Sequence, residues 1–171
     1  MINRLQTRLS ALRSEGRCGL APYVTAGDGG METTLAVLRA LDRTPVACIE
    51  LGLPFSDPVA DGPVLQAAAE RALASGASFD HVLDLIARFR GEPPIGEAPI
   101  VLMGYANSLL RRGWDASCRA LAEAGADGVL VADLPSKRAP RSPRPPRARG
   151  SRRSSSPRRR RATSASPPPR G

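Results

Sequence analysis

Histidine and cysteine are scarce in this chain, which limits the metal chemistry it can support. It has one histidine and three cysteines in 171 residues, and none of the cysteines is paired at the spacing of a zinc site. Cys18, Cys48 and Cys118 lie in or beside apolar segments at wide intervals. That placement is typical of reduced core cysteines in a cytosolic protein. We therefore expect a cytoplasmic protein with no metal site.

Long apolar runs are also missing. No segment approaches the ~20 apolar residues that a membrane-spanning helix needs, and the N-terminus lacks the apolar core of a signal peptide. Arg4, Arg8 and Arg13 could belong to a transit peptide. Leucines recur among them at helical spacing, however, which favours an amphipathic first helix. We expect no membrane association.

Acidic residues are absent from the C-terminal part of the chain. Residues 136–171 hold 13 of the 25 basic residues and none of the 16 acidic ones, so residues 1–135 carry a net charge of −4. The same segment has no aromatic residue and no aliphatic residue larger than alanine. It cannot bury enough surface to offset its ordering entropy. We expect a folded body, residues 1–135, and a disordered Arg/Pro/Ser-rich tail, residues 136–171.

Within the body, short apolar runs alternate with amphipathic helical patterns, which indicates a parallel sheet with helices packed outside it. Both a doubly wound sheet and a (β/α)8 barrel have this pattern. No Gly-x-Gly-x-x-Gly follows the first run, which weakens a dinucleotide-binding interpretation. Acids at the end of a strand fit the catalytic face of a barrel. The expected strands are residues 20–24, 46–51, 100–103 and 128–132.

The second of these strands carries an acid, and two more acids follow it. If Ile49 and Leu51 face covering helices, Glu50 between them points to the opposite side of the sheet. Burial there disfavours the charged carboxylate, so we expect Glu50 to donate a proton near neutral pH. Taken alone, a buried acid can equally belong to a structural network or bind a metal. Taken alone, Asp57 and Asp61 are turn residues or helix caps.

The block around these acids, residues 49–62 with the sequence IELGLPFSDPVADG, resembles the signature of tryptophan synthase α subunits. The resemblance continues in residues 22–28 (PYVTAGD), 102–107 (LMGYAN) and 128–135 (GVLVADLP), and it stops at Pro135. It implies a (β/α)8 TIM barrel of which only the first four β/α steps are present.

The resemblance also implies a reaction. The family cleaves indole-3-glycerol phosphate by a retro-aldol step into indole and glyceraldehyde 3-phosphate, and its β subunit condenses the indole with serine. Glu50 matches the acid/base carboxylate that protonates indole C3. Asp61 matches the acid that accepts a hydrogen bond from the indole nitrogen. Neither role requires a metal or another cofactor.

Two further sets of residues are implied. Tyr23, Leu102 and Leu130 resemble the walls of the indole pocket, with tyrosine where the family commonly has phenylalanine. On periodicity alone all three would be core residues. The surface that contacts the β subunit, in the α2β2 complex expected of the family, corresponds to Pro54, Asp57, Pro58 and Asn107.

The basic tail departs from the family. The family's mobile loop after strand 6 and its phosphate-binding loops after strands 7 and 8 belong to the half that this sequence does not show. We therefore expect the chain as written to be truncated and to lack α-subunit activity. An abrupt switch to the amino acids of GC-rich codons indicates a frameshift. The alternatives are nucleic-acid binding through the basic run 151–161, and an inactive partner of the β subunit.

Overall fold

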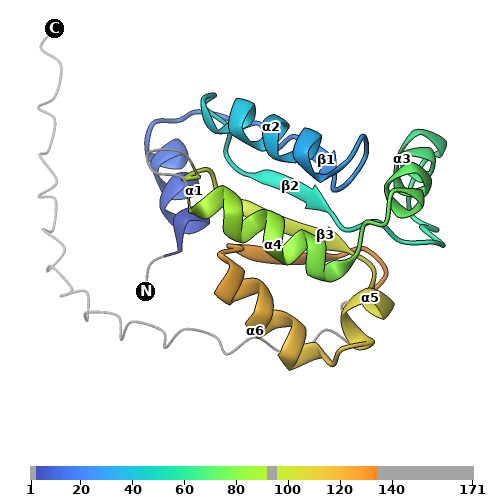
Figure 1. The fold of residues 1–171 in the computed structure, drawn as a ribbon. Helices are drawn as coiled ribbons and strands as arrows, with labels where there is room; N and C mark the ends of the chain where they lie inside the picture. Colours follow the sequence, from blue (N-terminus) through green and yellow to red (C-terminus); the bar gives the residue numbers. More distant parts are fainter. Residues whose placement is uncertain (1–2, 92–95, 135–171) are drawn as a thin grey trace, which may run out of the picture. The chain divides into compact units, whose positions relative to one another are not determined.

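The computed structural model describes residues 3–91 and 96–134. The basic tail lies outside the described residues, as does the last of the motif residues, Pro135. In the described part the expected parallel sheet is confirmed, with neighbouring strands in chain order (Figure 1). The strands are β1 (Tyr23–Thr25), β2 (Ile49–Gly52), β3 (Ile100–Gly104) and β4 (Gly128–Val131).

Helices connect these strands, as the sequence pattern predicts. The sequence pattern does not predict the five-residue helix after β3, because a segment of that length is too short to show a helical stripe. The helix that begins at Phe79 has an N-cap: the Ser78 side chain accepts a hydrogen bond from the His81 N–H at 3.3 Å. The helices are α1 (Arg4–Ser14), α2 (Met31–Asp42), α3 (Pro63–Ala74), α4 (Phe79–Arg90), α5 (Ala106–Leu110) and α6 (Trp114–Ala124).

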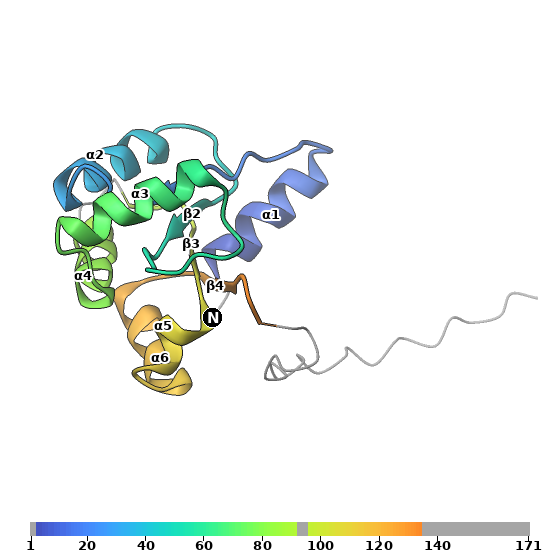
Figure 2. The ribbon, with the colours of Figure 1, turned by 90° about the vertical axis from the view of Figure 1, so that its right-hand side faces the viewer.

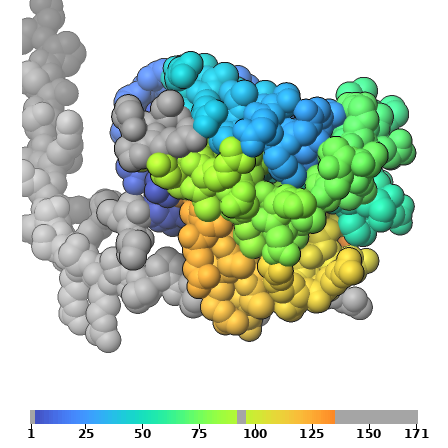
Figure 3. Space-filling view, viewed as in Figure 1, coloured from blue at the N-terminus to red at the C-terminus, as the bar shows by residue number. Residues whose placement is uncertain are grey.

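Helices α2, α4 and α6 cover one face of the sheet, and α1 lies on the other side (Figures 1 and 2). In the space-filling view α4 lies between α2 and α6 (Figure 3). Alternate strand residues point into this helix layer and are fully buried, among them Ile49, Leu51, Ile100 and Leu102. Each such side chain contributes about 1.5–3 kcal/mol of transfer free energy. We call the opposite side of the sheet its inner face.

In two helices the apolar residues at helical spacing are not all buried. Leu9 of α1 is 48% exposed and Val64 of α3 is 77% exposed. The residues of α3 that are buried are the alanines Ala68, Ala69 and Ala72. Figure 1 shows α3 beyond the end of β2 instead of along the sheet. A helix in that position buries only a narrow face, and small residues suffice for it. Among the described residues no helix could span a membrane.

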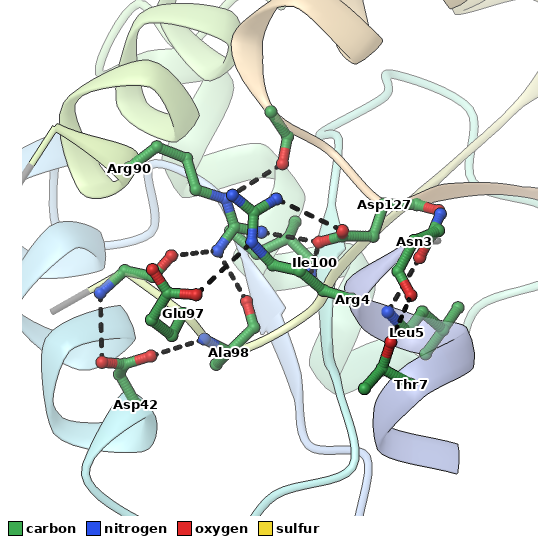
Figure 4. Close-up of polar contacts among 12 residues, drawn as sticks. Asn3, Arg4, Leu5, Thr7, Asp42, Arg90, Glu97, Ala98, Ile100 and Asp127 are labelled. Carbon is green, nitrogen blue, oxygen red and sulfur yellow. Dashed lines mark hydrogen bonds and ion pairs between the residues drawn. The ribbon is translucent and has the colours of Figure 1, made fainter. Parts of the chain in front are cut away.

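A buried polar network fixes the N-terminal ends of β3 and β4 (Figure 4). The Arg90 guanidinium donates to the carbonyl oxygens of Gly125 at 2.9 Å and Ala98 at 2.8 Å, and to that of Gly96. Its Nη2 also donates to the Asp127 carboxylate at 2.7 Å. Burial lowers the pKa of Arg90, and the charge of Asp127 opposes that shift.

The partners of this network are held as well. The Asp127 carboxylate accepts the Ile100 N–H at 3.0 Å, and Asp42 accepts the N–H groups of Ala98 at 2.6 Å and Gly96 at 3.1 Å. Every buried side-chain polar atom in the described residues has a hydrogen-bond partner. This is a structural device at the end of the sheet opposite the acidic loop, where barrels place stability rather than catalysis.

Candidate functional site

The strand register brings the inner-face residues into two rows. Tyr23 pairs with Glu50, and Glu50 pairs in turn with Val101. In the next row, toward the C-terminal ends of the strands, Gly52 pairs with Met103. Paired residues of a parallel sheet point to the same side, so each row forms one band across the inner face. Gly128 completes the first row; Thr25 and Leu130 complete the second.

Glu50 is half-buried on this face, while its neighbours Ile49 and Leu51 are fully buried in the helix-covered core. The alternation expected from the sequence therefore places Glu50 where it was predicted to lie. The charge of Glu50 raises the pKa of two neighbouring groups. Burial, and secondarily the Glu50 charge, raises the pKa of the Cys48 thiol. Tyr23 is the other group.

The Tyr23 ring lies against Gly52. A Cβ added to Gly52 would be 2.0 Å from the Tyr23 hydroxyl oxygen and 2.4 Å from its Cζ. Burial raises the pKa of Tyr23, a hydrogen bond with the Thr25 side chain opposes this, and the charges of Asp61 and Glu50 raise it further. Glu50 is the residue that pairs with Tyr23 across β1 and β2, whereas Asp61 comes from the loop after β2.

Asp61 lies in the loop between β2 and α3, and Tyr105 holds that loop. The Tyr105 hydroxyl accepts the Ala60 N–H at 3.0 Å. Burial raises the pKa of that hydroxyl, and the Asp61 side chain raises it further. The ring stacks on Phe55, with centroids 5.2 Å apart and planes 22° apart. Tyr105 is only 3% exposed. Nothing in its sequence context pointed to this role; a lone tyrosine just after a strand predicts only burial.

The expected partner surface is divided in the structure. In the loop between β2 and α3, Asp57 is exposed and Pro58 is half-buried. The next residue, Val59, is 72% exposed. Pro54 is buried, but it lines a groove of about 430 Å³ together with exposed Asn107. Phe55, Phe79 and Arg111 also line this groove. All four expected residues thus lie in the β2–α3 loop or at the start of α5.

The structure does not bring Leu102 to the inner face. Leu102 pairs with Leu51, is fully buried and belongs to the helix-covered core. Met103, the next residue, pairs with Gly52 and lies on the same side as Glu50. Leu130 does lie on this side and is 41% exposed. In a strand that is apolar at every position, the sequence does not show which set of alternate residues faces inward.

The site therefore offers two carboxylates, a phenol and apolar side chains at the C-terminal ends of parallel strands. No cluster of three or more metal-ligating side chains occurs in residues 3–91 and 96–134. Such a set can donate a proton at one point and accept a hydrogen bond at another. Helices on one face of a parallel sheet, with acids at its carboxyl edge, match the architecture of part of a β/α barrel.

The comparisons with known proteins identify the family. The profile of the tryptophan synthase alpha chain family matches residues 9–145. The tryptophan synthase alpha chain of Alkalilimnicola ehrlichii is 50% identical over 138 residues, which cover 81% of this chain and 50% of that protein. The chain belongs to the tryptophan synthase alpha chain family. The family match extends beyond Pro135, where the motif resemblance stops.

Solved structures agree with this assignment. The tryptophan synthase α subunit of Legionella pneumophila has a TM-score of 0.75 and 41% identity, with 79% of this chain and 51% of that chain covered. The ligand-free tryptophan synthase of Mycobacterium tuberculosis has a TM-score of 0.73 and 32% identity, with 80% and 53% covered. The described fold is part of their (β/α)8 barrel. The chain spans about half the length of its relatives. Nothing in these matches supports nucleic-acid binding.

Proposed function

We propose that Glu50 and Asp61 are the acid pair of an α-subunit reaction, the retro-aldol cleavage of indole-3-glycerol phosphate in tryptophan biosynthesis. Glu50 protonates indole C3, and Asp61 accepts a hydrogen bond from the indole N–H. The observation that carries the proposal is the pairing of Glu50 with Tyr23 on the inner face, with the loop of Asp61 held by the hydrogen bond from the Ala60 N–H to Tyr105, which directly follows β3. A proton donor and a hydrogen-bond acceptor near one aromatic wall suit a substrate with a flat ring and one N–H.

The apolar part of the substrate site follows from the register. We assign the ring-binding walls to Tyr23, Met103 and Leu130, which lie on the side of Glu50. Met103 replaces Leu102, which is buried in the helix-covered core. The Tyr23 hydroxyl adds a polar group to the wall.

The partner in this proposal is the tryptophan synthase β subunit. Its contact surface comprises the groove lined by Pro54 and Asn107 and the neighbouring loop with Asp57 and Pro58. Exposed Val59 in the same loop adds apolar surface that a partner would cover. The loop that carries Asp61 would then also contact the partner.

The test is indole release from indole-3-glycerol phosphate. Because the chain spans half of its relatives, we would assay it beside a chimera in which residues 1–134 are joined to the C-terminal half of the Legionella α subunit. The chimera should be active, and Glu50→Gln should lower kcat by roughly 10²–10⁴-fold. Glu123→Gln, an exposed residue of α6, is the matched control. Equal rates for the chimera and its Glu50→Gln variant would refute the assignment. The intact chain alone is expected to be inactive.

A further inference from the structure

Tyr105 is attached to the loop between β2 and α3 at two points. Its ring stacks on Phe55, and its hydroxyl accepts the N–H of Ala60, the residue before Asp61. The backbone N–H groups of the neighbours Val59 and Asp61 bond within the loop, to the carbonyls of Asp57 at 2.9 Å and Pro58 at 3.0 Å. The Ala60 N–H instead donates to a group outside the loop, the Tyr105 hydroxyl.

Tyr105 is itself fixed to the sheet. It directly follows β3, and the next residue, Ala106, donates its N–H to the Asp133 carboxylate at 2.7 Å. The start of the loop is tied to the same strand, because the Leu53 N–H donates to the Met103 carbonyl at 2.8 Å. With 3% exposure the ring has little freedom to move. The loop thus rests on a rigid support.

The stack also reaches the groove. Phe55 lines the groove of about 430 Å³ together with Pro54 and Asn107, and it is the ring on which Tyr105 stacks. A side chain that belongs to both the groove wall and the stack transmits a displacement of one to the other, because close-packed rings cannot move independently. The other groove ring, Phe79, interacts instead with the Arg112 guanidinium, 5.3 Å from its centroid.

We infer that Tyr105 is a positioning residue for Asp61: it holds the N–H of the neighbouring Ala60 and, through its stack on Phe55, connects the loop of Asp61 to the wall of the groove. The inference rests on the roles proposed above for Asp61 and the groove, and it names the side chain that connects them. Tyr105 does not itself carry a step of the reaction here; it sets where the acid lies.

The first test measures hydrogen exchange of the Ala60 amide by NMR in the intact chain. Tyr105→Phe keeps the ring and removes the hydroxyl, so exchange at Ala60 should accelerate roughly tenfold. Tyr23→Phe removes a phenol hydroxyl that does not bond Ala60 and should leave its exchange unchanged. The Ile49 amide, bonded to the Pro99 carbonyl at 2.7 Å, reports whether the sheet stays intact. Unchanged exchange at Ala60 in Tyr105→Phe would overturn the inference.

A double-mutant cycle tests the link to the groove. Phe55→Leu should accelerate exchange at Ala60 several-fold, and it should add nothing, within about twofold, in the Tyr105→Phe background. Phe79→Leu changes the other groove ring and should leave Ala60 unaffected. If the effects of Phe55→Leu and Tyr105→Phe multiply, or if Phe55→Leu has no effect, the groove is not linked to Asp61 through Tyr105.

A spectroscopic titration separates a charge contact from mere packing. The chain has two tyrosines, so in the Tyr23→Phe variant tyrosinate absorbance reports Tyr105 alone. Burial raises the pKa of Tyr105, the Ala60 N–H opposes the shift, and the Asp61 and Asp133 side chains raise it further. Asp61→Asn should therefore lower the titration midpoint, whereas Asp57→Asn in the same loop should not. Equal midpoints for Asp61→Asn and its parent would contradict the contact.

These readouts do not depend on turnover. If the chimera fails to release indole while the exchange and titration results hold, the proposed reaction is wrong and the positioning by Tyr105 stands. If the chimera is active and exchange at Ala60 is the same with and without the Tyr105 hydroxyl, the proposed reaction stands and the positioning by Tyr105 is wrong.

Discussion

The Tyr23 ring lies directly over Gly52 on the inner face of the sheet. The phenol of Tyr23, from β1, occupies the space that any Cβ at the last residue of β2 would need, since that atom would be 2.0 Å from the hydroxyl oxygen. The absence of a side chain at residue 52 is thus what allows the ring to lie across β2 beside Glu50. The glycine is required by a neighbouring side chain and not by its own backbone conformation.

Gly52→Ala should accordingly destabilise the protein. The new methyl group must displace a half-buried ring, and overpacking of this kind costs about 1–3 kcal/mol in free energy of unfolding. Urea denaturation measures it. Gly104→Ala is the matched control, because Gly104 also ends a strand and a Cβ there would meet Leu53 at an ordinary 3.5 Å. If the clash with Tyr23 is the cause, Tyr23→Ala should abolish the cost of Gly52→Ala. A cost that persists in that background would contradict this explanation.

Arg90→Met should be among the most destabilising single substitutions in the body. It removes the shorter of the two ion pairs of Asp127, whose side chain is 4% exposed, and leaves Arg4 at 3.5 Å; three carbonyl oxygens also lose a donor. Breaking a buried ion pair from one side costs about 3–5 kcal/mol. Arg17→Met is the control, since Arg17 and its partner Glu15 are both more than half exposed; its effect should stay within about 0.5 kcal/mol. Equal unfolding midpoints for the two variants would refute a stabilising role of the network.

The ion pair of Asp28 with Arg71 makes stability depend on pH in the acid range. Two hydrogen bonds of 2.8 Å from Arg71 lower the pKa of Asp28 below its ordinary value. A carboxyl whose pKa is lower in the folded state stabilises the fold above its unfolded pKa of about 3.9. That contribution is lost as the pH falls through the folded value. Urea midpoints from pH 2 to 7 should therefore converge for the wild type and Asp28→Asn at the acid end. Parallel curves would show that the pair contributes nothing, as some exposed pairs do.

The three cysteines should differ in their rate of alkylation. Cys18 is exposed, Cys118 is intermediate and Cys48 is buried with a raised pKa. Because the thiolate is the reactive form, iodoacetamide should label Cys18 first and Cys48 last. Peptide mapping by mass spectrometry gives the individual rates, and labelling in urea, where the differences should vanish, is the control. Rapid labelling of Cys48 in the folded chain would mean that β2 opens readily.

The local sequence predicted secondary structure and side-chain direction correctly where a residue's environment depends on its neighbours along the chain. The strand at Ile49–Gly52 and the direction of Glu50 follow from alternation within one strand. Helix α4 follows from the helical spacing of its apolar residues. It was a poor guide for α3, where the apolar residue Val64 lies exposed because the helix packs at the end of the sheet.

What the sequence by itself determined is the alternation of strands and helices, the side of the sheet on which Glu50 lies, and the motif that resembles one family. Only the tertiary structure decided that Met103 and not Leu102 lies beside Gly52, that Tyr23 fills the space over Gly52, and that Tyr105 holds the loop of Asp61. The reason is physical. Alternation along a strand is set by covalent geometry, whereas register and contacts across strands depend on hydrogen bonds and packing between segments far apart in the chain.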